Sequence, residues 1–194
     1  MGVMNTSLFG AGSAELAPGA RNAVEVCLAI RPDEQVALIA DEASGEVFTT
    51  PASVDGVFVC DGTAGDYFGP KYGDLRSTPL TLEISGGRLL TAQCPRRDLE
   101  DEFWSYCHTD EHSDRVGELA FGTNVALNEM IGVLLQDEKI PGVHIAFGDP
   151  YGSQTGAPWK SRTHIDVLTR DCDVWIDDEQ VIGQGRYLME RFGL

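Results

Sequence analysis

The 194-residue sequence contains no apolar run of about 18 residues, the length that a membrane-spanning helix needs. Its first stretch, "MGVMNTSLFGAGSAEL", has no basic segment ahead of an apolar one and is therefore not a signal peptide. We interpret residues 1–17 as a flexible N-terminus. These absences predict a soluble protein that is neither inserted in a membrane nor secreted.

Basic residues are scarce, with 14 Lys and Arg against 31 Asp and Glu, which gives a formal net charge of −17 at pH 7. A surface that binds nucleic acid needs clustered lysine and arginine to neutralise phosphates. The balance therefore argues against nucleic acid as a partner. We expect most of the surplus carboxylates to lie on the solvated surface, and some of them to bind metal ions.

No Cys-x-x-Cys pair occurs in the sequence, which argues against a zinc ribbon or a redox motif. An odd number of cysteines without a secretory signal is typical of a reduced, cytoplasmic protein. We expect each cysteine to be a small buried residue rather than a nucleophile. The five are Cys27, Cys60, Cys94, Cys107 and Cys172.

Short β-rich runs separated by Gly and Asp turn signals dominate the chain from Ser44 onwards. Residues 80–92, "LTLEISGGRLLTA", predict a hairpin around the glycine pair. Residues 97–107 predict an amphipathic helix, and residues 126–136 a second helix weakened by a glycine. Residues 142–148, "GVHIAFG", predict a buried strand. We therefore expect an α+β fold, mainly antiparallel or mixed β with few helices.

The N-terminal part has a different texture. Residues 18–31 show helical spacing behind a proline, and the apolar run "QVALIA" (35–40) predicts a buried strand. A helix followed by a strand indicates an α/β element. We therefore divide the chain into the flexible N-terminus, a helix–strand segment over residues 18–43, and a main domain over residues 44–194.

The stretch "SRTHIDVL" (161–168) places two titratable groups on one face of a predicted strand. His164 and Asp166 share that face because side chains alternate along a strand. His144 lies inside a second apolar run. A lone histidine in a buried strand is more often a core residue than a ligand, but two histidines and a carboxylate on neighbouring strands suit Zn, Fe, Co or Mn.

Further polar residues stand at unusual places in apolar runs. Glu46 opens "GEVFTTP" and Glu118 lies in "VGELAFGTN". Glutamate is rarely buried unless it is paired, so exposed strand ends and a buried site are equally favoured for both. Tyr151 follows His144 by seven residues in a glycine-rich loop, where its hydroxyl could act as an acid, an electrophile or a ligand, or its ring could simply pack.

Together these stretches resemble the thermophilic-type metallo-aminopeptidases, the aminopeptidase T and aminopeptidase S family, including its leucyl aminopeptidase-like members. The resemblance is co-linear from about Ser44 to Tyr187 and includes "LLQDEKIPGVHIAFGDPYG". Family members are longer, with an α/β domain ahead of the metal domain. The resemblance therefore implies that residues 18–43 are a remnant of that domain. It also implies a site near domain and dimer interfaces, and we expect a homodimer.

The resemblance implies two divalent metal ions (Zn, Co, Mn or Mg) and the removal of N-terminal residues from a peptide substrate. Tyr151 would stabilise the oxyanion or assist proton transfer, and Glu118 is assigned a catalytic role besides its role as a ligand. Because every ligand position of the family is filled here but most of its first domain is missing, the resemblance argues for metal binding more strongly than for efficient turnover. The implied metal ligands are Glu46, Glu118, His144, His164 and Asp166.

Other functional classes are compatible with the same residues. The 2,5-dihydroxypyridine dioxygenases resemble this domain, and two histidines with one carboxylate suit a single Fe(II). A dinuclear hydrolase needs Glu46 and Glu118 as ligands, whereas a mononuclear oxygenase does not, which favours the hydrolase. A third hypothesis is a catalytically impaired metal-binding module.

Overall fold

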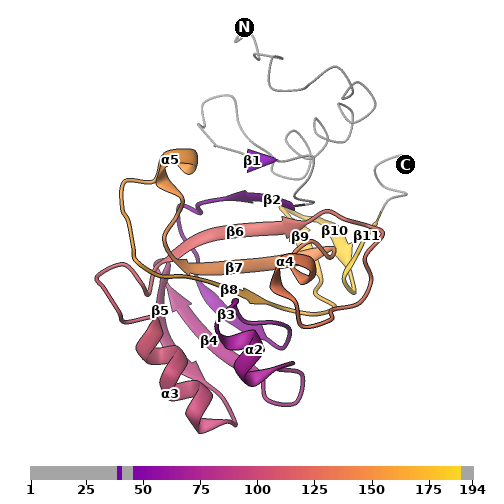
Figure 1. Ribbon diagram of the computed structural model, residues 1–194. Coiled ribbons are helices and arrows are strands. Elements are labelled where there is room, and N and C mark those ends of the chain that lie inside the picture. Colours follow the sequence, from indigo (N-terminus) through magenta and orange to yellow (C-terminus); the bar gives the residue numbers. More distant parts are fainter. Residues whose placement is uncertain (1–38, 41–45, 189–194) are drawn as a thin grey trace, which may run out of the picture.

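The protein is described by a computed structural model that covers residues 39–40 and 46–188 (Figure 1). The predictions for residues 1–17, and those for residues 18–43 apart from residues 39–40, lie outside the described residues. The end of the predicted strand 35–40 forms β1, Ile39–Ala40. In the part of the chain that the structure describes, no helix is long and apolar enough to cross a membrane.

A large antiparallel sheet forms the centre of the structure. Within the described residues its strand order is β1–β2–β6–β7–β8, and every pair of neighbours is antiparallel. This sheet confirms the buried strand predicted over residues 142–148. Its other strands are β2 (Glu46–Thr49), β6 (Val116–Gly122), β7 (Gly142–Gly148) and β8 (His164–Leu168).

One smaller antiparallel sheet is inserted in the sequence between β2 and β6, and a second follows β8. The predicted hairpin is confirmed, because β4 and β5 pair around the Gly86-Gly87 turn. The first small sheet consists of β3 (Gly56–Cys60), β4 (Leu80–Ser85) and β5 (Arg88–Gln93). The second consists of β9 (Val174–Ile176), β10 (Glu179–Gly183) and β11 (Arg186–Tyr187).

The hydrophobic core lies between one face of the large sheet and the sheet β3–β4–β5. From β7 and β8, Ile145, Phe147, Ile165 and Val167 point into this core. Figure 1 shows α2 (Phe68–Tyr72) and α3 (Arg97–Tyr106) on the same side, beside β3–β4–β5. The core face of the large sheet is thus covered, which leaves its other face available for a site.

The predicted helix over residues 97–107 is confirmed, with Leu99 and Phe103 fully buried. The cysteines of the described part also agree with their prediction in part. Cys60 and Cys107 are buried, and burial raises the pKa of each thiol. Cys94 and Cys172 are half-buried. The observed mixture of helices with mainly antiparallel sheets confirms an α+β fold.

The helix predicted over residues 126–136 is wrong, because only α4, Leu134–Asp137, is helical there. The preceding residues are mostly irregular, with a turn at residues 125–126 and a bend at residue 132. Gly132 has φ +81°, outside the helical region. The Asp137 carboxylate accepts hydrogen bonds from the backbone N–H groups of Ile131 and Gly132, at 2.8 and 2.9 Å. Local side-chain bonds to the backbone thus replace the helical pattern.

Candidate metal centre

Strand register gathers the predicted ligands on the face of the large sheet opposite the core, which we call the site face. Along β8, His164 and Asp166 alternate with the core residues Ile165 and Val167. Asp166 pairs with Ala146, and Ala146 also pairs with Glu118. His144 lies two residues from Ala146 and therefore shares the face. Glu46 on β2 pairs with Gly122 at the far end of β6.

A β-bulge turns Glu118 towards the site face. Val116 pairs with Phe147 in the core, and the register shifts before Glu118 pairs with Ala146. Without that shift, Val116 and Glu118 would share one face, since they are two residues apart. Gly117 permits the close approach, because a Cβ there would lie 2.7 Å from the Gly148 carbonyl oxygen. Of the two alternatives that the sequence left open for Glu118, the buried one is therefore observed, because Glu118 is 4% exposed.

Small residues separate the polar side chains across the strands. Ala120 pairs with His144, Ala146 with Asp166, Gly122 with Glu46 and Gly148 with His164. Ala120 and Ala146 are themselves fully buried. Each polar side chain therefore leans over a neighbour that leaves space above the sheet.

One cluster, which we call the His–Asp position, consists of Glu118, His144, His164 and Asp166. His144 Nε2 lies 3.5 Å from Glu118 Oε1, and His164 Nε2 lies 3.7 Å from Glu118 Oε2. Asp166 Oδ1 lies 3.4 Å from His164 Nε2. Ligand atoms of Glu118, His144 and Asp166 all lie within 4.8 Å of one another. Glu118 thus stands between the imidazoles, with one oxygen directed at each.

These distances suit a shared cation better than direct hydrogen bonds. Ligand atoms around a tetrahedral ion with bonds of about 2.0–2.1 Å stand about 3.4 Å apart. His144 Nε2 is buried and has no hydrogen-bond partner among the described residues. A buried polar atom left in this way is costly unless a ligand satisfies it. The donor set of imidazole nitrogens and carboxylate oxygens therefore fits a divalent transition metal.

His164 is oriented by the backbone behind it. Its Nδ1 lies 2.8 Å from the carbonyl oxygen of Asp149, which leaves Nε2 directed into the site. Burial by itself would lower the pKa of His164, but Asp166 and the other neighbouring acceptors outweigh it and raise the pKa to about 9. The His144 pKa is raised in the same way, against burial, by Glu118, Asp166 and Glu46. The surrounding carboxylates thus favour a positive charge at this position, either on the imidazoles or on a bound ion.

A second cluster, which we call the Glu–Lys position, consists of Glu46, Glu138 and Lys139. Lys139 Nζ lies 3.3 Å from Glu46 Oε1 and also contacts Glu138 Oε1. Burial raises the pKa of both glutamates, and for Glu46 the neighbouring Glu138 adds to the rise. Ligand atoms of Glu46, Glu138 and His144 lie within 4.8 Å of one another. The two positions therefore meet at His144.

Tyr151 lies at the other end of the site. Its ring centroid is 4.6 Å from that of His164 and 6.0 Å from that of Phe48. Its backbone is left-handed, with φ 51°, an uncommon conformation for a non-glycine residue that often marks functional sites. Burial and the acidic neighbours, Asp166 first, raise the Tyr151 pKa to about 12. The phenol is therefore a protonated hydrogen-bond donor at neutral pH.

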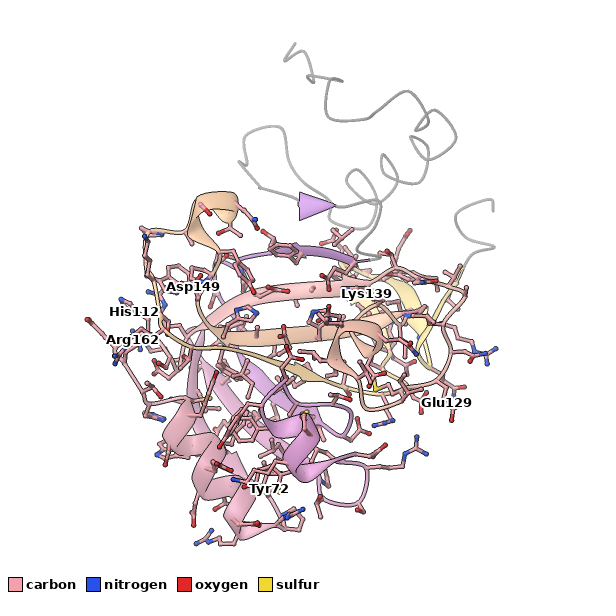
Figure 2. The ribbon with its side chains drawn as sticks, viewed as in Figure 1. Tyr72, His112, Glu129, Lys139, Asp149 and Arg162 are labelled. Carbon is pink, nitrogen blue, oxygen red and sulfur yellow. The ribbon has the colours of Figure 1, made fainter. Side chains whose placement is uncertain are left out.

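The site opens into a cavity of about 610 Å³. Its lining combines acidic groups with apolar side chains, among them Phe48 from β2 and Leu135 from α4. Tyr67 and Tyr106 stack at 6.3 Å on the side of α2 and α3. In Figure 2, Lys139 and Asp149 lie towards opposite ends of the large sheet, and the site lies between them.

Five of the six residues singled out from the sequence line this cavity, and His144 lies buried beside Glu46 and Glu118, although their binding of metal stays a prediction. Sequence reasoning missed Glu138, Lys139 and Asp149. The first two stand in "DEK" directly ahead of the buried strand β7, a charged run that could have signalled them. Asp149 accepts a hydrogen bond from the Tyr151 backbone N–H at 2.9 Å and orients His164 through its carbonyl.

Comparison with known proteins finds solved structures with a similar fold. No family model and no curated protein matches the sequence. Among solved structures, the 2,5-dihydroxypyridine dioxygenase from Pseudomonas putida KT2440 has a TM-score of 0.57 and 20% identity over 75% of this chain. AmpT from Thermus thermophilus has a TM-score of 0.55 and 20% identity over 79% of this chain. The chain spans 44% of the length of each of these structures. The likeness shows a shared fold.

Proposed function

We propose that this protein is a metal-dependent aminopeptidase, which removes N-terminal residues from peptides by hydrolysis. The fold likeness to AmpT and the sequence resemblance to the aminopeptidase T family support this proposal. The observation that carries it is the buried position of Glu118 between both imidazoles, with Glu46 and Glu138 close by. A mononuclear oxygenase has no need of these glutamates.

The chemistry of the cavity fits a peptide N-terminus. Divalent ions at the ligand residues would supply Lewis acidity and lower the pKa of a bound water. The acidic groups of the lining would attract the positively charged α-amine, and Phe48 and Leu135 would contact the N-terminal side chain. The Tyr151 hydroxyl would donate a hydrogen bond to the developing oxyanion. We further propose that the active form is a homodimer.

Purified protein reconstituted with Zn²⁺, Co²⁺, Mn²⁺ or Mg²⁺ tests the proposal through hydrolysis of amino-acid p-nitroanilides. We expect turnover with at least one of these ions and none after chelation. The same preparations, and protein loaded with Fe(II), should be assayed for oxygen consumption with 2,5-dihydroxypyridine. Oxygen consumption without p-nitroanilide hydrolysis would overturn the proposal.

Replacing Tyr151 with phenylalanine should lower kcat by about 100-fold, the typical cost of one oxyanion donor, while metal content stays unchanged. Tyr72→Phe is the matched control, because neither Tyr72 nor Glu102, which its hydroxyl contacts, lines the cavity. Steady-state kinetics with metal analysis compares the variants. An unchanged kcat in Tyr151→Phe would show that Tyr151 only packs against Phe48 and His164 and takes no part in the reaction.

The second candidate function is a ring-cleaving dioxygenase with a single Fe(II). It is favoured by the fold likeness to the Pseudomonas putida enzyme and by the grouping of His144, His164 and Asp166 on neighbouring strands. Two histidines and one carboxylate with open positions suit Fe(II) and oxygen. Iron content near one per chain with activity on hydroxypyridines would favour this function.

A further inference from the structure

Lys139 lines the cavity, and the proposed reaction leaves this cationic residue without a role. Its side chain is only 17% exposed, and Nζ contacts the carboxylates of Glu46 and Glu138. An ammonium group is strongly hydrated, so it is held away from water only where charges pair with it. The Glu–Lys position thus already contains a cation that belongs to the chain.

The backbone holds Lys139 at this place. Its N–H donates to the Gln136 carbonyl at 3.1 Å, and its carbonyl accepts a hydrogen bond from the Asn124 N–H at 2.9 Å. The same segment passes directly over Gly122 at the end of β6. Only the flexible side chain can therefore move the ammonium group out of the Glu–Lys position.

His144 makes the two positions unequal. Its Nε2 approaches Glu118 Oε1 at 3.5 Å and Glu46 Oε2 at 3.7 Å, but one lone pair can bind one ion. The His–Asp position offers a second imidazole, from His164, together with two carboxylates. Once an ion there has taken His144, the Glu–Lys position retains two carboxylates and an ammonium group.

We propose that the Lys139 ammonium is the resident cation of the Glu–Lys position and limits a second metal ion. The His–Asp position then binds one divalent ion tightly, and a second ion binds weakly because Lys139 must first move away. This inference rests on the proposed function for its ion sites alone and not for hydrolysis. It adds a form of regulation, since the concentration of free metal would set the fraction of chains with both ions.

Equilibrium binding of Mn²⁺ and Zn²⁺ to the full chain tests this inference, by calorimetry and by metal analysis after equilibrium dialysis. We expect the wild type to bind a second ion at least about tenfold more weakly than the first. Lys139→Met keeps the length of the side chain and removes its charge. This variant should lower the Kd of the second ion about tenfold or more, and it should leave the Kd of the first ion within about threefold of the wild-type value.

Two variants control for charge and for position. Lys139→Arg keeps the positive charge, and its second step should stay weak. Lys160→Met removes one positive charge from an exposed position outside the cavity, and both of its steps should match the wild type. Tightening in Lys160→Met equal to that in Lys139→Met would overturn the inference, because it would reflect net charge alone.

The outcomes separate this inference from the proposed function. If ions bind and Lys139→Met leaves the second step unchanged, the inference is overturned while the aminopeptidase proposal stands. If both steps behave as expected but no p-nitroanilide is hydrolysed, the proposed function is overturned and the inference stands. If neither protein binds an ion, both are overturned.

A measurement on the wild type covers the case in which Lys139→Met does not fold. Reductive methylation of lysines, followed by mass spectrometry, should label Lys139 slowly in the metal-free and singly loaded chain. Metal at concentrations that fill the second step should increase its labelling at least about threefold, as the ammonium group leaves the carboxylates. Labelling that is independent of metal would overturn the inference.

Discussion

Replacing His144 with glutamine is expected to weaken binding of the first divalent ion by more than about 100-fold. Loss of a residue that only supports a metal ligand already lowers metal affinity about 10–100-fold, and His144 is itself a member of both candidate ligand groups. Hydrolysis should be lost with the ion. Glutamine has a similar volume to histidine, so the packing between Ala120 and Leu168 on the neighbouring strands should survive.

Thermal unfolding with and without added metal measures this effect. An ion at 100 times its Kd stabilises the wild type by about 2.7 kcal/mol. For a domain of this size that raises Tm by about 5–10 °C. His144→Gln should show almost no rise, whereas His108→Gln, at an exposed position after α3, should keep the full rise. If metal raised the Tm of His144→Gln as much as that of the wild type, His144 would not be a metal ligand.

Replacing Gly122 with alanine is expected to destabilise the fold by about 3 kcal/mol. An added Cβ would lie 1.9 Å from the Ile140 carbonyl oxygen and 2.7 Å from that of Glu138. Both are backbone atoms, so the segment that carries Glu138 and Lys139 must move away from β6. The Glu–Lys position should therefore be lost together with stability, while the His–Asp position keeps its ligands.

Thermal unfolding and metal binding together test this expectation. Tm should fall by about 6–12 °C, and the weak second binding step should disappear while the first remains. Gly69→Ala, within helix α2, is the control. A Cβ at Gly69 would meet its nearest neighbour, the Thr63 side chain, at an ordinary contact distance of 3.4 Å. That variant should be as stable as the wild type. An unchanged Tm in Gly122→Ala would show that the segment over β6 adapts freely.

Local pattern was sufficient to predict most of the elements. The alternation in "SRTHIDVL" predicted that His164 and Asp166 share a face, and β8 confirms it. The hairpin at residues 80–92 and the helix at residues 97–107 follow from turn and amphipathic signals. The prediction failed over residues 126–136, where the Asp137 side chain binds backbone N–H groups that a helix would have used.

The site was predictable in its residue types and only partly in its geometry. Glu46, His144 and Asp166 stand out in the sequence because charged groups are rare inside apolar runs. Their convergence depends on pairing between strands that are far apart in the chain, which no local pattern encodes. Glu138 and Lys139 lie in a connecting segment, where charged residues are ordinary, so their place in the site became evident only from the folded chain.

The sequence by itself determined the strands, the alternation of polar and apolar side chains along them, and the inventory of possible ligands. Alternation is a local property of the backbone and needs no partner strand. The tertiary structure alone decided the register across β2, β6, β7 and β8, and the bulge at Gly117 that turns Glu118 out of the core. A shift of one residue in any strand reverses its faces, so the site exists only because long-range packing selected this register.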